Sequence, residues 1–156
     1  ESLFSKMFDL SRGAFFSLAG KEEVRTEPLT ISSLVPLALR TLPRAIATQL
    51  VGAHLTNMAE FWLRHPLPSI AANEHSYMPQ GSNLSVSRGF TSVPLNWLLW
   101  RGLNHHGFTE IASQLAESTV QMVADEGLRE FYDADTGDGA GARSFGWSAL
   151  ALDMTR

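Results

Sequence analysis

The pattern of apolar and polar positions along the chain predicts a mainly helical protein. In several stretches apolar residues recur every three to four positions, as on one face of a helix. In residues 110–126, for example, Ile111, Leu115 and Val123 share one face, and Thr109 and Gly127 are typical residues at the two ends of a helix. The predicted helices cover residues 34–40, 43–55, 94–106, 110–126 and 147–154.

Three segments lack this helical period. Residues 8–9 and 12–16 indicate two brief extended segments around a glycine turn. Residues 65–91 contain prolines and glycines and form a predicted loop that is long for a compact domain, and loops of this length are usually functional or mobile. Residues 130–139 are rich in Asp and Gly, which is typical of a further loop.

The order of the helices predicts an all-α fold. Residues 94–106 are apolar nearly all round, which indicates a buried helix, whereas residues 110–126 form an amphipathic one. Alternation of buried and amphipathic helices is typical of stacked helical hairpins, as in solenoids and α/α barrels.

Composition narrows the class of protein. The 156 residues are 44% hydrophobic and 18% charged, which suits one folded domain. The net charge of -4 gives no basic footprint for a nucleic-acid partner, and the absence of cysteine excludes disulfides and thiol chemistry. No apolar run reaches the roughly 18–20 residues of a membrane span, and residues 1–8 lack the plan of a signal peptide. We therefore expect a cytoplasmic protein without a membrane partner.

Three stretches carry more specific information. The first is Pro66-Leu67-Pro68-Ser69-Ile70-Ala71 with Tyr77-Met78-Pro79. The second is Arg88-Gly89 with Pro94-Leu95-Asn96-Trp97-Leu98-Leu99 and Gly102-Leu103. The third, which is the most specific, is Glu130-Phe131-Tyr132-Asp133, Thr136-Gly137-Asp138-Gly139-Ala140 and Phe145-Gly146-Trp147-Ser148-Ala149. In order and spacing they resemble the C-terminal region of glycoside hydrolase family 63, which includes mannosylglycerate and glucosylglycerate hydrolases and processing α-glucosidases.

The resemblance implies a barrel of six α-helical hairpins with the sugar at its centre, and inverting hydrolysis of an α-glycosidic bond. Such enzymes use two carboxyl groups roughly 6.5–9.5 Å apart, one as the acid and one as the base that activates water. The family's base opens the motif that Glu130 opens here, so Glu130 is the expected general base. This chemistry requires no metal and no other cofactor.

The chain is too short for the whole barrel. Twelve helices of about 11–12 residues each, with their loops, need far more than 156 residues. Nothing in the sequence matches the part of the family that supplies the acid. We therefore expect all 156 residues to form the C-terminal half of one barrel domain, and the missing half to be a partner from the same precursor, a second chain or another copy.

One motif departs from the family pattern. The family carries Tyr-Trp-Arg-Gly-Pro-Val-Trp where this chain has Val86-Ser87-Arg88-Gly89-Phe90-Thr91-Ser92. Ser87 and Ser92 therefore occupy the two Trp positions, whose side chains help to form the sugar pocket in the family. This difference implies either altered specificity or a chain that does not catalyse.

Three further residues are candidates for substrate binding. Arg88 follows the long loop and suits a substrate hydroxyl or carboxylate, although a structural role is equally open. Tyr77 lies in the long loop, and Trp147 opens the last helix as either core support or pocket wall. The Asp residues at 133, 135 and 138 do not fit a calcium-loop pattern, so we expect an Asx-turn there and no metal.

Two functions of different classes remain open. The first is part of an inverting glycosidase for a small α-glucoside or α-mannoside, such as glucosylglycerate or mannosylglycerate, in which this chain supplies the base. The second is a non-catalytic half barrel that binds sugar or serves in assembly.

Overall fold

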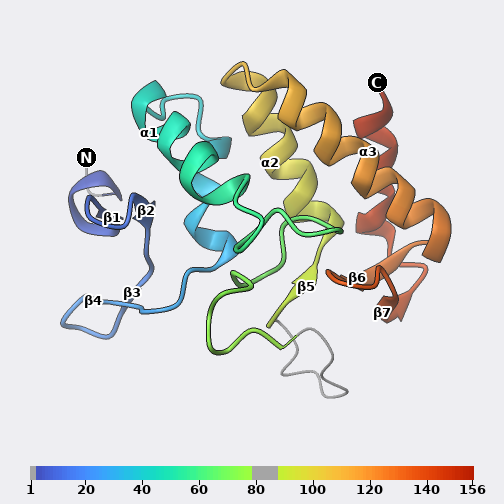
Figure 1. Ribbon diagram of the computed structural model, residues 1–156, viewed down its shortest axis with the longest axis horizontal. Coiled ribbons are helices and arrows are strands. Elements are labelled where there is room, and N and C mark those ends of the chain that lie inside the picture. The colour runs from blue at the N-terminus through green and yellow to red at the C-terminus, as the bar shows by residue number, and fades with distance from the viewer. Residues whose placement is uncertain (1–2, 79–87) are drawn as a thin grey trace.

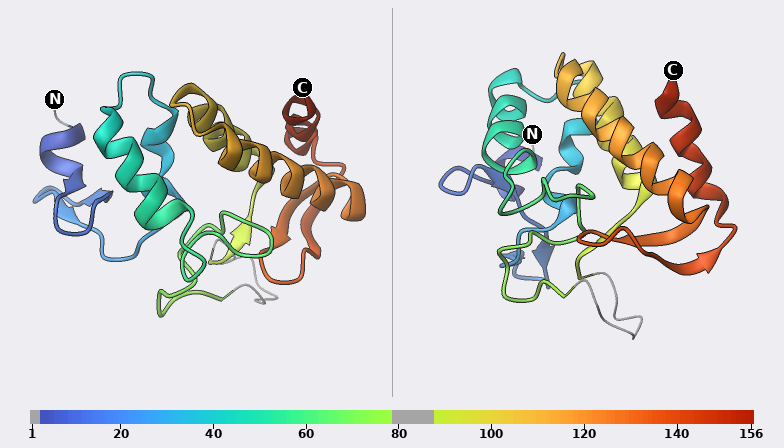
Figure 2. Two further views of the ribbon diagram at one scale, coloured as in Figure 1. Left: turned by 45° about the horizontal axis from the view of Figure 1, so that its top comes forward. Right: turned by 45° about the vertical axis from the view of Figure 1, so that its right-hand side comes forward.

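The structure is a computed structural model that describes residues 3–78 and 88–156. It consists of helices, two small hairpins and a three-stranded sheet (Figure 1). The hairpins lie at one end, and the longest helices and the sheet lie toward the other end (Figure 2). The helices are η1 (Leu3–Met7), η2 (Ile31–Ser33), η3 (Val35–Ala38), α1 (Arg44–Gln49), η4 (Leu50–Leu55), α2 (Val93–His105), α3 (Thr109–Glu126) and η5 (Gly146–Thr155). The strands are β1 (Phe8–Asp9), β2 (Ala14–Phe15), β3 (Leu18–Ala19), β4 (Val24–Arg25), β5 (Phe90–Thr91), β6 (Arg129–Asp133) and β7 (Gly139–Arg143).

The N-terminal region contains two antiparallel hairpins, β1–β2 and β3–β4. In the first hairpin Phe8 pairs with Phe15, and Gly13 adopts a left-handed φ of 67° that turns the chain. This confirms the extended segments expected around a glycine turn. The ring of Phe15 is buried against Phe8, with centroids 4.8 Å apart, and so attaches the hairpin to the core.

The central feature of the fold is the hairpin of α2 and α3. These two helices confirm the helices predicted over residues 94–106 and 110–126. Pro94 lies in the first turn of α2, and Gly107, with φ of 78°, separates the helices. Leu99 and Leu103 of α2 and Leu115 of α3 are fully buried. Burial of leucine side chains contributes about 1.5–3 kcal/mol each, so this interface is a main source of stability.

The shorter helices differ from the expected continuous ones. The helix expected over residues 34–40 is present only as the 3₁₀ segment η3, and η2 precedes it, with Leu34 between the two. Pro36 lacks an N–H group, so a single helix that ran from η2 through η3 would lose a backbone hydrogen bond there. The last predicted helix is also present, as the 3₁₀ segment η5, and it packs against both α2 and α3.

The three-stranded sheet has the order β5-β6-β7 and is antiparallel throughout. Phe90 pairs with Asp133, and Tyr132 pairs with both Thr91 and Gly139. The register shifts by one residue on β7, where Gly141 has φ of 69° and produces a bulge. The sheet therefore brings the end of the long loop beside the motif that begins with Glu130.

The all-α prediction is wrong, because the protein contains these three antiparallel sheets besides its helices. The strands are two to five residues long, which is too short for an alternating apolar pattern to show in the sequence. The Gly-rich sequence of β7 in particular has weak intrinsic strand preference, and it is held as a strand by its pairing with β6.

A search of residues 3–78 and 88–156 for a helix long and apolar enough to cross a membrane finds none.

Candidate active site

The turn between β6 and β7 is organised by one carboxylate. Oδ1 of Asp133 accepts hydrogen bonds from the backbone N–H groups of Asp135 and Thr136, at 2.8 and 2.9 Å. The N–H of Gly137 donates to the Asp133 carbonyl, and Gly137 takes the left-handed φ of 88° that the turn requires. The acidic segment is therefore an Asx-turn, as expected, and its central carboxylate is used in holding the hairpin.

Glu130, the expected base, lies near the start of β6 and is half-buried. Its Oε2 accepts a hydrogen bond of 3.0 Å from the backbone N–H of Ala142 on β7. The glycine at 141 gives this carboxylate room, since a Cβ there would lie 2.7 Å from Oε2. This hydrogen bond holds Oε2 at a fixed position on the hairpin, and a general base has to be positioned in this way.

The described pockets do not include Glu130 among their lining residues. Its neighbour Phe131 lines one of them. A Cβ at Gly141 would lie 2.9 Å from the Glu130 Cβ and 3.2 Å from Cδ2 of Phe131, so these two side chains lie close together. The carboxylate is positioned by its own hairpin.

Tyr77 is directed toward the Asp-rich turn. Its hydroxyl donates to Oδ1 of Asp135 at 3.3 Å, so the long loop is attached to the β6–β7 hairpin. Burial, followed by the charge of Asp135, raises the pKa of the Tyr77 phenol above its ordinary value. The group therefore stays protonated and acts as a hydrogen-bond donor.

Arg88 and Trp147 are the other two residues expected to contact a substrate. The Arg88 side chain is exposed, and its carbonyl accepts a 2.6 Å hydrogen bond from the N–H of Met78. Trp147 is 67% exposed at the start of η5. Ser87 lies outside the described residues. Among the described residues, neither the Arg88 nor the Trp147 side chain makes a hydrogen bond to the carboxylate of Glu130, and Tyr77 donates to Asp135 instead.

His65 is a residue near the turn that the sequence did not point to. Its ring packs against Gly137, where a Cβ would lie 2.8 Å from Cε1. Both ring nitrogens are buried, and burial is the main reason that the His65 pKa is lowered, while the nearby charge of Asp133 opposes the shift. The two contacting positions are far apart in the sequence, so no local motif could have revealed them.

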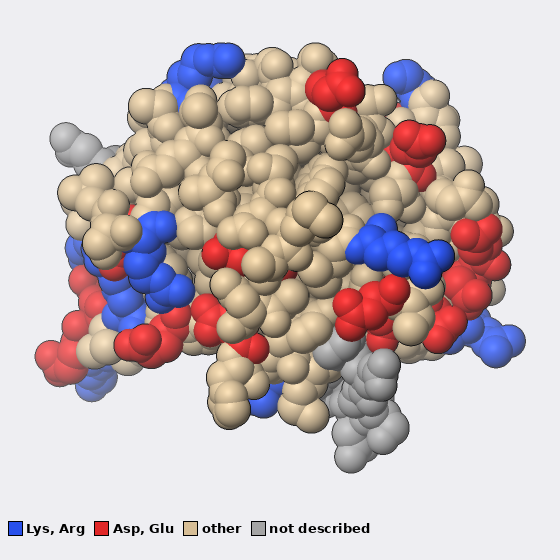
Figure 3. Space-filling view, in the orientation of Figure 1, with Lys and Arg blue, Asp and Glu red and all other residues tan. Residues whose placement is uncertain are grey.

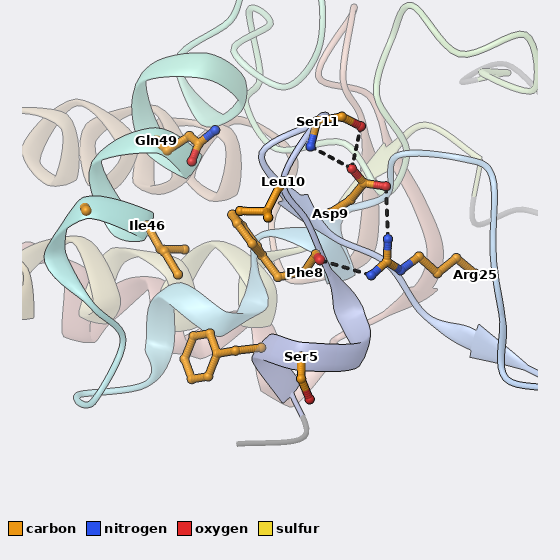
Figure 4. Close-up of a pocket in the computed structure, with 10 residues that line it drawn as sticks. Ser5, Phe8, Asp9, Leu10, Ser11, Arg25, Ile46 and Gln49 are labelled. Atoms are coloured by element: carbon orange, nitrogen blue, oxygen red, sulfur yellow. Dashed lines mark hydrogen bonds and ion pairs between the residues drawn. The ribbon is translucent and has the colours of Figure 1, made fainter.

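A pocket of about 670 Å³ at the N-terminal end is not an acid–base site (Figure 4). Among its described lining residues, Asp9 is the only carboxylate. Oδ1 of Asp9 accepts hydrogen bonds from the N–H and hydroxyl of Ser11, and its Oδ2 pairs with Arg25 at 3.2 Å. This carboxylate is therefore occupied in holding the β1–β2 turn, as the dashed lines in Figure 4 show.

We expect Asp9→Asn to lower the melting temperature at pH 7 and to matter less in acid. The hydroxyl of Ser11, followed by the N–H of Arg12, lowers the pKa of Asp9 below its unfolded value of 3.8. The contribution to stability is therefore present above pH 3.8 and is lost as the pH falls through the folded pKa. Thermal melts between pH 7 and about pH 2.5 test whether the melting temperatures of the parent and Asp9→Asn become equal as the pH falls. Glu22→Gln, which removes an exposed carboxylate in the β3–β4 turn, is the matched control.

A second pocket, of about 350 Å³, lies beside β5 and β6. Its lining includes four hydroxyl side chains and two aromatic rings, which are Thr30, Ser32, Ser69, Ser92, Phe90 and Phe131. The family 63 pattern has Trp at two positions, which are Ser87 and Ser92 in this chain. Ser92 belongs to the described residues and lines this pocket.

Positively and negatively charged side chains are mixed on the face shown in Figure 3. There the described Lys and Arg residues lie among Asp and Glu residues along the lower part of the molecule, and the upper part is mostly uncharged. A ligand approaching this face meets mixed charges close to the sheet.

Comparison with known proteins places the chain among the glycoside hydrolases. The chain is 31% identical to mannosylglycerate hydrolase of Thermus thermophilus over 157 aligned residues, which cover 96% of this chain. Its structure resembles that of a GH63 mannosylglycerate hydrolase from Thermus thermophilus in complex with glucose, with a TM-score of 0.85, 27% identity and 97% of this chain covered. Neutral trehalase of Saccharomyces cerevisiae, at 20% identity and a TM-score of 0.73, shares the fold over 99% of this chain and 28% of its own.

The chain belongs to the family of mannosylglycerate hydrolase MGH1-like glycoside hydrolase domains, because the profile of this family matches residues 1–148. This confirms the resemblance seen in the three motifs.

The chain spans only part of these relatives. It covers 35% of the curated Thermus thermophilus enzyme and 37% of the chain in the glucose complex. The activity and substrate of the whole proteins are therefore proposals for this chain.

Proposed function

We propose that this chain is the base-bearing part of an inverting glycoside hydrolase, and that Glu130 is the general base. The observation that carries the proposal is the family match over residues 1–148, which includes the motif opened by Glu130. The hydrogen bond from the Ala142 N–H to Oε2 supports it, because it holds the carboxylate at a fixed position.

The proposed substrate is a small α-mannoside or α-glucoside. Mannosylglycerate is the substrate in the names of the relatives, and a related enzyme has been seen with glucose. Glu130 would remove a proton from a water molecule as that water attacks the anomeric carbon. The acid that protonates the leaving oxygen would come from residues outside this chain, so the reaction requires a further part of the enzyme.

The experiment is an assay for free mannose and glucose, combined with native mass spectrometry of the purified sample. Mannosylglycerate, glucosylglycerate and trehalose are the substrates to compare. Release of sugar by a complex that contains this chain and a further polypeptide supports the proposal. A complex of this chain with the remaining part of the enzyme that releases none of these sugars contradicts it.

A second function is favoured by one specific observation. Ser92 stands where the family pattern has a Trp. This difference suits a non-catalytic module that binds sugar or serves in assembly. Sugar binding without turnover, unaffected by Glu130→Gln, would establish this alternative.

A further inference from the structure

A basic pocket lies between the end of η3 and the last turns of α2. Its volume is about 200 Å³, and its described lining residues are Arg40, Arg101 and His105 with Ala38 and Leu98. None of these residues is acidic, although the chain as a whole carries a net charge of -4. The basic pocket therefore concentrates positive charge on a protein with an acidic balance, which suits an anionic ligand.

The two guanidinium groups of the basic pocket have N–H donors to offer. Across residues 3–78 and 88–156, the side chains of Arg40 and Arg101 form no hydrogen bond and no ion pair. Arg25, by contrast, donates to Asp9 and to two backbone carbonyls. A guanidinium presents its donors as a planar fork that matches two oxygens of one phosphate or carboxylate group.

Contacts with α2 position both arginines. Cζ of Arg101 lies 5.0 Å from the ring centroid of Trp97, one turn earlier in the helix, in a cation–π arrangement. Nε2 of His105 lies 3.4 Å from the carbonyl oxygen of Arg40, and Nε2 of His106 lies 3.1 Å from that of the preceding residue. These contacts restrict the Arg101 side chain and the Arg40 backbone before a ligand binds, which lowers the entropy cost of binding.

The partial negative charge at the C-terminal end of α2 is offset by local donors. The N–H of His106 donates to the Gly102 carbonyl at 3.0 Å, and the N–H of Gly107 donates to the Asn104 carbonyl at 3.1 Å. The carbonyl of His106 accepts a 2.6 Å hydrogen bond from the guanidinium of Arg44. A cation at this end of a helix compensates its dipole, so the helix end is compatible with an anion nearby.

Charge and size favour phosphate among the anions. The two guanidinium charges balance a phosphate group, which carries a charge of about -1.5 to -2 at pH 7, whereas one fork is enough for a single carboxylate. A volume of about 200 Å³ lies below the usual range for drug-sized ligands, so it suits a phosphate group with at most a small organic part.

The basic pocket is distant from the sheet that carries Glu130. β5, which pairs with β6, leads into the N-terminal end of α2, whereas Arg101 and His105 lie in its last two turns (Figure 1). From Ser92 to these two residues the helix axis rises by roughly 14 to 20 Å, at about 1.5 Å per residue.

We propose that the basic pocket is a binding site for a phosphate group, either free or carried by a small organic phosphate. The site goes beyond the function proposed for Glu130 and does not depend on it.

The test is a titration of the ¹⁵N-labelled chain with inorganic phosphate and with glycerol 3-phosphate, at pH 7 and constant ionic strength, followed by the shifts of backbone amide signals. We expect saturable shifts centred on residues 38–41 and 98–105. Arg40→Gln and Arg101→Gln should each bind about threefold to tenfold more weakly, because each loses charge-assisted hydrogen bonds at an exposed position. Arg64→Gln removes an exposed arginine outside this pocket and should bind as the parent does.

The two ligands distinguish the sources of the phosphate. Tighter binding of glycerol 3-phosphate supports an organic phosphate as the ligand, and equal binding supports the free ion. Shifts that do not saturate, shifts centred elsewhere, or affinities that are equal in the parent and in both arginine variants would contradict the site. Acetate that binds as tightly as phosphate would also overturn the assignment.

The spectrum of each variant checks its fold. If Arg101→Gln does not fold after losing its contact with Trp97, Arg40→Gln decides the test. Sugar release by the enzyme that contains this chain is measured separately, so a failure of phosphate binding leaves the proposal for Glu130 standing.

Discussion

Glu130→Gln is expected to reduce kcat of the active enzyme that contains this chain by about 10²- to 10⁴-fold, with little change in KM. The substitution removes the proton acceptor and keeps the size of the side chain. The amide oxygen of Gln can still accept the hydrogen bond from the Ala142 N–H, so the hairpin should remain folded. Initial rates of sugar release, together with the melting temperature of each protein, measure the two effects separately.

Glu126→Gln is the matched control for this prediction. Glu126 also binds the same hairpin, since its Oε2 accepts a 3.2 Å hydrogen bond from the N–H of Gly139. It lies at the end of α3 and has no assigned role in the reaction. Its substitution should leave kcat within about twofold of the parent, because no proton transfer is assigned to it. If Glu130→Gln retains activity to the same extent as Glu126→Gln, Glu130 is not the base.

Gly102→Ala is expected to destabilise the protein by about 1–2 kcal/mol, which lowers the melting temperature by about 2–8 °C. A Cβ at position 102 would collide with the carbonyl oxygen of Leu37 and would lie 2.7 Å from the Leu37 carbonyl carbon and 3.0 Å from the Ala38 nitrogen. Because these atoms are backbone, η3 would have to move away from α2. The higher helix propensity of alanine offsets only part of this cost.

Gly52→Ala provides the opposite expectation with the same chemical change. Gly52 lies in η4, and a Cβ there would meet nothing within 4 Å. Alanine should therefore stabilise the protein by about 0.5–1 kcal/mol. Thermal or urea unfolding of both variants measures the two free energies. Equal effects of the same sign would show that α2 does not pack on η3 as described.

The long periodic segments of the fold could be predicted from the sequence, because their signals are local. The stripe of Ile111, Leu115 and Val123 and the glycine at 127 are sufficient to place α3. The sheet could not be predicted, since β5 has two residues and its pairing with β6 joins segments that are distant in the chain. The sequence also could not show that η5 is a 3₁₀ helix, because its apolar pattern is equally compatible with an α-helix.

The candidate site could be predicted in part. The family motif singled out Glu130, and the Asp-rich composition indicated the turn that Asp133 organises. Whether Arg88, Tyr77 and Trp147 bind a substrate stays a prediction, although the contact of Tyr77 with Asp135 is now visible. The packing of His65 on Gly137 and the meeting of Arg40 with Arg101 in one pocket depend on tertiary contacts, which a single sequence does not encode in any local pattern.

The measurement that tests the central claim most directly is a proton NMR time course of the first product released from mannosylglycerate by the enzyme that contains this chain. The anomeric proton signals distinguish α- from β-mannose before mutarotation mixes them. An inverting enzyme with Glu130 as base should release β-mannose first, and the signal should be absent with Glu130→Gln. Initial release of α-mannose, or a β-mannose signal that persists at the parent rate in Glu130→Gln, would contradict the account.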